Sequence, residues 1–276
     1  EEVANLNLGI GGPIDYNGEE TYYSLQAALD AVSSDGEYVN VSADQGELDE
    51  TYTQPTALGS TTGLSAVSLD NNVVIVGGDN TQIEYPDVGA AAITDNDGEE
   101  ITVDNLNISG NGFIADPGRI LIDVGSAGTD LTVQDSTFDT FDTDVIETDG
   151  VNSVSVSNSD FDGDTGDDYN GIQVVDTGGN VDIDGNTFAN ISAGTGIDVQ
   201  DMGGAHFANI TSNTVNIDAG TGIIVDASNN NAQGVINDNT VEGSANGGVG
   251  LRVEANGGET STIDVDGDVI NNTGAS

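Results

Sequence analysis

Residues 131–138 read LTVQDSTF, and the same pattern returns as VSVSNSDF at 154–161 and VDIDGNTF at 181–188. Each copy has apolar residues at alternate positions, then a short polar turn, then one more apolar residue. The pattern also occurs in weaker form at 101–108, 208–215, 234–241 and 263–270, and the final apolar residues are 23 to 30 positions apart. Repeats of this period are typical of solenoids, in which each unit buries its apolar face by stacking on its neighbours.

A second pattern is interleaved with the first, as GIQVVD (171–176), GIDVQD (196–201), GIIVDA (222–227) and GLRVEA (250–255). Two or three short strands per repeat, with Gly, Asn and Asp at the corners, predict a β-solenoid. Parallel strands stack about 4.8 Å apart, so one interior column should contain the residues that end the first pattern, Phe138, Phe161, Phe188, Val215, Val241 and Ile270. The same register aligns Asn186, Asn213 and Asn239 as a structural ladder at one corner.

These motifs resemble those of the right-handed parallel β-helix proteins of the pectate lyase type, which include polygalacturonases and pectin methylesterases. The likeness covers roughly residues 20–272. It is specific in the NTF/NTV corner with its later Gly-apolar-x-Val strand, and in the entry YYSLQAALDAV, YVNVSA and VSLDNNVVIVGGDNTQIE. It implies an all-β fold, a right-handed parallel β-helix solenoid with one N-terminal capping α-helix. It does not imply an activity, because this fold serves many functions.

The capping helix is expected at 24–33, where Leu25, Ala28, Leu29 and Val32 follow helical spacing after Ser24 as N-cap. It would cover the first coil within a single domain, residues 14–276, preceded by an N-terminal extension, residues 1–13. No comparable segment follows the last repeat. We therefore expect a homopolymer in which residues 3–10 of one subunit add as a strand to the C-terminal coil of the next. The competing explanation is that further coils follow Ser276 in the natural protein.

Composition narrows the possible partners. The chain has 276 residues, 49 of them acidic and only two basic, with a formal charge of −47 and no cysteine. This balance argues against nucleic acid, and no apolar run is long enough for membrane insertion. Screening by salt would relieve the repulsion, so we expect a halophilic or marine setting. The opening EEVANLNLGIGG has no initiator Met, which fits a secreted protein, located extracellularly or at the cell surface. Five N-x-S/T sequons, at Asn40, Asn107, Asn190, Asn209 and Asn271, fit a glycoprotein.

Aspartates are densest in DFDGDTGDDYNG at 160–171, with FDTFDTD at 138–144 one repeat earlier. Carboxylates from adjacent coils repel one another unless a cation lies between them, and Ca²⁺ prefers such hard oxygen ligands. The hypothesis is a Ca²⁺ site, and a solvated acidic loop is its alternative. Its candidate ligands are Asp142, Asp144, Asp160, Asp162, Asp164, Asp167 and Asp168.

An enzymatic interpretation competes with this one. Polygalacturonases resemble this region in carrying Asp pairs on neighbouring coils, which implies a glycoside hydrolase that uses Asp144, Asp167 and Asp168. However, the family's G-H-G and R-I-K clusters have no counterpart here. Without them the sequence predicts a non-enzymatic structural or adhesive protein, a subunit of an extracellular filament stabilised by divalent cations. A polysaccharide or a neighbouring cell would be its further partner.

Overall fold

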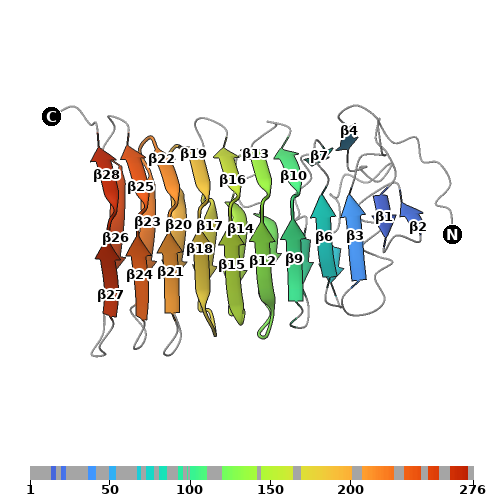
Figure 1. Cartoon of the computed structure of the whole chain (residues 1–276), viewed down its shortest axis with the longest axis horizontal. Helices are drawn as coiled ribbons and strands as arrows, with labels where there is room; N and C mark the ends of the chain where they lie inside the picture. Colours follow the sequence, from blue (N-terminus) through green and yellow to red (C-terminus); the bar gives the residue numbers. More distant parts are fainter. Residues whose placement is uncertain are drawn as a thin grey trace.

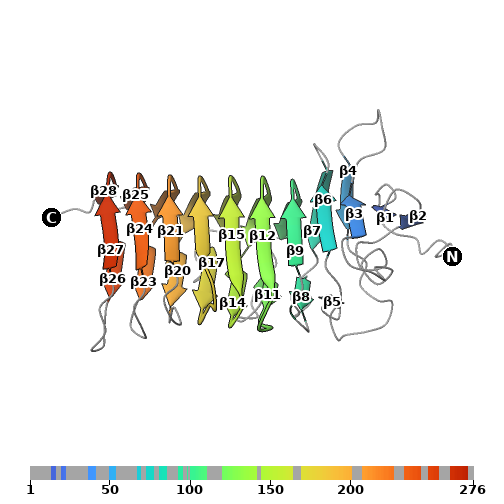
Figure 2. The same cartoon turned by 60° about the horizontal axis from the view of Figure 1, so that its bottom comes forward.

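A computed structural model of the chain describes residues 14–16, 20–22, 37–41, 50–53, 67–69, 73–77, 81–85, 93–95, 98, 100–110, 120–141, 144–163, 169–200, 207–226, 233–243, 248–254 and 262–272. Within these ranges every regular element is a strand, and three sheets run side by side along the molecule (Figures 1 and 2). The predicted helix 24–33 and the extension 1–13 lie outside the described residues. None of the described residues forms a helix long and apolar enough to cross a membrane.

Sheet A has eleven strands. In spatial order they are β2 (Glu20–Tyr22), β1 (Ile14–Tyr16), β3 (Glu37–Val41), β6 (Val73–Gly77), β9 (Glu100–Asp104), β12 (Asp130–Gln134), β15 (Ser153–Ser157), β18 (Val181–Asp184), β21 (Phe207–Thr211), β24 (Gln233–Asn237) and β27 (Thr262–Asp266). All neighbours from β3 to β27 pair in parallel, whereas β1 is antiparallel to both β2 and β3.

Sheets B and C complete each coil. Sheet B contains β4 (Glu50–Thr53), β7 (Thr81–Tyr85), β10 (Asn107–Gly110), β13 (Thr137–Phe141), β16 (Asp160–Gly163), β19 (Thr187–Ile191), β22 (Thr214–Ile217), β25 (Thr240–Gly243) and β28 (Val269–Asn272). Sheet C contains β5 (Val67–Leu69), β8 (Ile93–Asp95), β11 (Ile120–Val124), β14 (Asp144–Asp149), β17 (Ile172–Val175), β20 (Thr195–Gln200), β23 (Thr221–Asp226) and β26 (Val249–Glu254).

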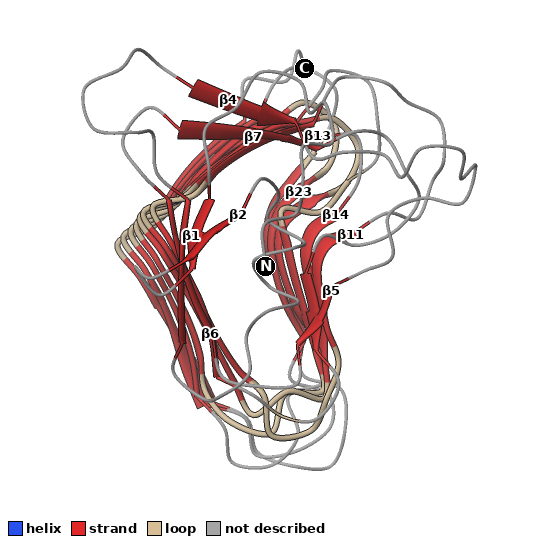
Figure 3. Cartoon of the chain, turned by 90° about the vertical axis from the view of Figure 1, so that its right-hand side faces the viewer, coloured by secondary structure: helices blue, strands red, loops and turns tan. Residues whose placement is uncertain are grey.

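The handedness of the solenoid agrees with the one expected from the sequence. Seen from the N-terminal end, it passes clockwise from sheet A through sheet B to sheet C while it recedes from the viewer, which is a right-handed turn (Figure 3). The sequence-based prediction of a right-handed parallel β-helix is confirmed.

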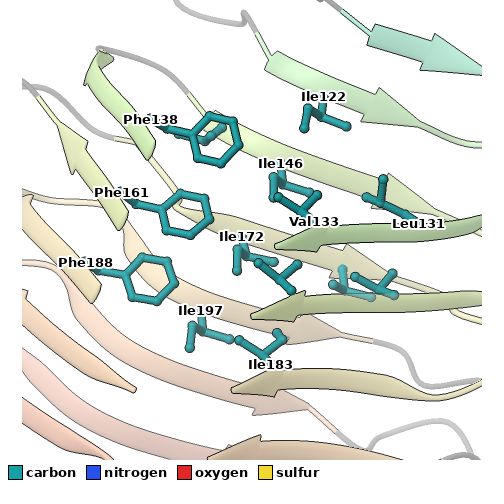
Figure 4. Close-up of a cluster of buried hydrophobic side chains, with 14 of the residues drawn as sticks. Ile122, Leu131, Val133, Phe138, Ile146, Phe161, Ile172, Ile183, Phe188 and Ile197 are labelled. Carbon is teal, nitrogen blue, oxygen red and sulfur yellow. The ribbon is translucent and has the colours of Figure 1, made fainter. Parts of the chain in front are cut away.

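The core is a set of side-chain columns that run along the axis (Figure 4). Phe138, Phe161 and Phe188 are paired across β13, β16 and β19, and their ring centroids are 5.0 and 4.7 Å apart. Val215 and Val241 continue this column and are buried. Ile270 occupies the next position by register but is 48% exposed, because no described coil stacks on it. The predicted column is therefore correct in register, and Ile270 differs only in burial.

The second sequence pattern begins with glycine because the chain packs closely there. A Cβ on Gly171 would lie 2.5 Å from the ring of Phe188, and one on Gly196 would lie 2.5 Å from Val215. Gly222 and Gly250 have the same relation to Val241 and Ile270. A side chain at this corner would therefore displace the neighbouring coil's core residue.

The corner between sheets A and B is a tight two-residue turn. Its first residue has a positive φ, an arrangement that Gly, Asn and Asp tolerate best; these residues are Asn105, Asp135, Asn158, Gly185, Ser212, Asp238 and Gly267. The second residue points inward and forms the ladder: Leu106, Ser136, Ser159, Asn186, Asn213, Asn239 and Asp268. The predicted asparagine ladder is confirmed and continues at both ends with other residue types.

Candidate functional site

The predicted metal ligands lie partly on sheet B and partly on sheet C. Asp160 and Asp162 are on β16, where they flank the buried Phe161 and therefore lie on the outer face of sheet B. Asp144 begins β14 in sheet C. The other four candidates, Asp142, Asp164, Asp167 and Asp168, lie outside the described residues. Among the described side chains, no group of three or more His, Cys, Asp or Glu is placed to hold a metal ion.

The register places carboxyl groups from two adjacent coils beside each other. Asp139 on β13 is the direct neighbour of Asp162 on β16 in the parallel register. Neighbouring strands are about 4.8 Å apart, so these two outward carboxylates lie close to each other. Asn190 donates its side-chain N–H to Oδ1 of Asp162 from the opposite side. Asp162 is one of the predicted metal ligands, and Asp139 lies outside the predicted set.

Sheet C carries a second group of carboxyl groups on its outer face. Asp123, Glu147, Gln173 and Asp198 follow one another on successive strands, from β11 to β20. We name this set the sheet C row. Sequence reasoning selected none of its members. Its signal in the sequence is an acidic residue between two inward-pointing residues of a sheet C strand, such as Asp198 between Ile197 and Val199, and this signal does not reveal burial.

Burial raises the pKa of both Glu147 and Asp198. For Glu147 the largest cause is desolvation, and the charges of Asp123, Asp144 and Asp149 add to it. Asp198 is only 5% exposed although its side chain lies on the outer face. Desolvation raises the pKa of Asp198, whereas the amides of Gln200 and Gln173 favour its charged form. The row therefore resists full ionisation.

One oxygen of Asp198 has no hydrogen-bond partner. Gln200 donates its amide N–H to Oδ2, whereas Oδ1 is buried and unpaired. Arg252, the one cationic side chain among the described residues, attracts Asp198 across two coils but forms its ion pair with Glu254. An unpaired buried carboxyl oxygen disfavours the charged form of Asp198.

Asp144, at the start of β14, is linked to the next coil through Asn170. The backbone N–H of Asn170 donates to Oδ1 of Asp144 at 2.6 Å, and the amide oxygen of Asn170 accepts from the backbone N–H of Thr195 at 2.9 Å. Desolvation raises the pKa of Asp144, and the hydrogen bonds from Asn170 oppose this. A carboxyl group of this kind can act as an acid, but the two proposed partners, Asp167 and Asp168, lie outside the described residues.

The last coil that the structure describes is exposed at its C-terminal face. The interior positions Val253, Val265 and Ile270 are 39%, 46% and 48% exposed. Their neighbours one coil earlier, Val225, Ile236 and Val241, are all buried. This coil is an apolar cross-section bounded by three edge strands, β26, β27 and β28.

Comparisons with known proteins give a likeness of fold. No family model matches the chain, and no curated protein matches it. Two solved structures are similar to it, both A-modules of mannuronan C-5 epimerases from Azotobacter vinelandii. The AlgE6 module is 14% identical over 91% of this chain and 92% of its own, with a TM-score of 0.32. The AlgE4 module is 15% identical over 91% of this chain and 95% of its own, with a TM-score of 0.30. A likeness at this identity does not extend to activity.

Proposed function

We propose that the protein is a secreted, non-enzymatic structural or adhesive subunit of the cell surface, which polymerises head to tail into an extracellular filament. The observation that carries this proposal is the open last coil. Three interior positions whose equivalents in the preceding coil are buried are solvent-exposed there. Such a coil combines an apolar surface with unpaired strand edges, a combination that favours addition of further strands.

Strand direction supports a head-to-tail joint. Because β1 is antiparallel to both β2 and β3, β2 runs in the same direction as the rest of sheet A. The three sheets thus end in β2, β4 and β5 at the N-terminal side and in β27, β28 and β26 at the C-terminal side. A second copy displaced along the axis would meet each edge with a strand of parallel direction. Such a joint is heterologous, and one that does not close into a ring propagates as a filament.

Electrostatic repulsion between the subunits opposes the joint. Each subunit has a formal charge of −47, so repulsion between subunits is strong at low ionic strength. We therefore propose that salt or divalent cations such as Ca²⁺ are required, with the Asp139–Asp162 pair as one binding position. The predicted added strand, residues 3–10, is part of the proposal and lies outside the described residues.

Substitutions on the last coil test assembly. Val265→Asp and Ile270→Asp place charges on the exposed interior positions, where the isolated subunit already contacts solvent. We expect the double variant to remain folded by circular dichroism and to lose filaments in electron micrographs taken in molar salt with millimolar Ca²⁺. Thr262→Asp adds a charge to the same strand at an exposed position, and it serves as the control. A wild-type chain that stays monomeric by light scattering under these conditions would refute the proposal.

Deletion of residues 1–12 tests the strand-addition part separately. Filaments that persist unchanged without this segment would remove residues 3–10 from the joint, while the role of the last coil would stand. The non-enzymatic part is tested by assays on polygalacturonate, pectin and alginate, where we expect no turnover. Turnover that is abolished by Asp144→Asn would favour the glycoside hydrolase instead.

A further inference from the structure

The five N-x-S/T sequons differ in how well the asparagine can be reached. Asn107 and Asn209 are half-buried within strands β10 and β21. The side-chain oxygen of Asn107 is buried. The side chain of Asn40 lies outside the described set. Among the sequon asparagines whose side chains are described, only Asn190 and Asn271 are exposed, and these two are the accessible acceptors.

Asn190 also has an unusual backbone conformation. Its φ is +60°, and the parallel register between β19 and β22 shifts between Phe188 and Ile191. The chain therefore leaves the extended path at this residue, and its side chain stands on the outer face of sheet B. One hydrogen of the side-chain amide is donated to Asp162. The second hydrogen remains for another partner, since an amide nitrogen carries two.

Asn271 occupies a different position in the solenoid. It lies on β28, the edge strand of sheet B that the proposed joint would cover. Asn190 lies on β19, which two strands, β22 and β25, separate from that edge. A bulky group on Asn190 would thus leave the open coil free, whereas one on Asn271 would stand in the joint.

We propose that Asn190 is an N-glycosylation acceptor of this protein, an inference that rests on the proposed export to the cell surface. The co-reactant is an oligosaccharide linked through phosphate to a polyprenyl lipid, used by a transferase of the secretory system. Nδ2 of Asn190 loses one proton and forms a bond to C1 of the first sugar. The bond between C1 and the phosphate oxygen breaks, and the lipid phosphate leaves with that electron pair. Ser192 completes the recognised triplet.

The test uses the full chain, exported from a host that glycosylates N-x-S/T sequons. Intact mass gives the number of glycans, and enzymatic release in ¹⁸O-water marks each occupied asparagine in the peptides. We expect Asn190 to be occupied in most molecules and Asn107 and Asn209 to be bare. Asn190→Gln and Ser192→Ala should each remove that glycan mass, and the control Asn209→Gln should leave the mass of the glycans unchanged.

The result is independent of assembly. Light scattering on the same samples reports filaments, so a chain that is glycosylated at Asn190 but stays monomeric contradicts the filament and not the acceptor. A folded, exported chain with bare Asn190 overturns the inference, and so does equal occupancy at Asn107 or Asn209. Occupancy at Asn271 alone overturns it as well.

Discussion

The backbone N–H of Asn186 donates to Oδ1 of Asn213, one coil further along the axis, at 2.9 Å. Asn213 in turn donates its own backbone N–H to Oδ1 of Asn239 at 3.0 Å. Each corner of the solenoid thus depends on the side chain of the following coil. The hydrogen bonds all point in one direction, and among the described residues the last acceptor is Asp268.

The ladder predicts a large cost for removing Asn213. Asn213→Ala would leave the backbone N–H and one side-chain N–H of Asn186 buried without partners, and it would remove the bond from Asn213 to the carbonyl of Ile183. Buried unpaired polar groups cost about 1–3 kcal/mol each. We expect a loss of about 3 kcal/mol or more in the free energy of unfolding, measured by denaturant titration.

Asn213→Ser is the matched control for that variant. Serine is the native ladder residue at 136 and 159, where its hydroxyl oxygen accepts the N–H of the preceding corner. The serine variant should therefore retain part of the stability. Equal losses for alanine and serine would contradict the role of the ladder.

The phenylalanine column predicts a second effect on stability. Phe161 is stacked between Phe138 and Phe188 and is fully buried. Phe161→Ala should lower the free energy of unfolding by about 3–5 kcal/mol, as is usual for a buried aromatic residue. Phe207 is exposed, so Phe207→Ala should cost less than about 1 kcal/mol. A comparable loss in both variants would argue against a continuous core at Phe161.

These columns explain why the fold could be predicted from the sequence. Every coil has to place the same kind of residue at the same position, so Phe138, Phe161 and Phe188 report both the period and the register. Residues such as Gly171 are constrained in the same way, because a neighbouring coil fills the space of a side chain. The repetition gives many independent observations of one geometry.

The site was predictable only in part. Asp162 was among the predicted ligands, whereas Asp139, which the register places beside it, was not. Asp144 was grouped with Asp160, yet the corner between sheets B and C puts it on another face. The burial of Asp198 was missed, because an outward strand position is normally exposed and nothing in GIDVQD shows otherwise.

The raised pKa of Asp198 predicts a pH dependence of the free energy of unfolding. Because its folded-state pKa is raised, the folded state holds this proton more tightly than the unfolded state does. Stability from this group is thus fully present below the unfolded pKa of about 3.9, and it is lost as pH rises through the folded pKa. Asp198→Asn should remove that loss, so we expect the variant to be more stable than wild type above the folded pKa of Asp198 and to show a flatter pH profile in denaturant titrations. Asp182→Asn, at an exposed position of β18, removes the same formal charge as a control. If both variants change the pH profile equally, general repulsion and not burial is the cause.

The Asp139–Asp162 pair predicts a response to calcium. A cation that binds only the folded state stabilises it by about 2.7 kcal/mol at a hundredfold excess over its Kd. Millimolar Ca²⁺ should raise the Tm in low salt, and Asp139→Asn with Asp162→Asn should remove most of the rise. Sodium chloride at matched ionic strength controls for screening. A Tm that EGTA does not change in low salt would contradict a calcium site.

Asp268 predicts a substitution that stabilises the protein. It ends the ladder: its Oδ1 accepts from both the backbone N–H and the amide of Asn239, at 2.8 and 2.9 Å. In the preceding three coils the second side-chain atom is an amide nitrogen, which donates to a carbonyl of the adjacent sheet A strand one coil back. The register puts the carbonyl of Ile236 in that position for Asp268. Asp268 offers an oxygen there instead, and this Oδ2 is buried without a partner.

Asp268→Asn should therefore supply the missing donor and extend the asparagine ladder by one coil. We expect a gain of about 1 kcal/mol, the usual contribution of one hydrogen bond, in the free energy of unfolding. Hydrogen exchange should show slower opening of β27 and β28, which flank this corner. Asp266→Asn, which removes the same charge from an exposed position two residues earlier, is the control. An equal gain in the control would assign the effect to charge, and no gain in Asp268→Asn would show that the ladder does not continue to this coil.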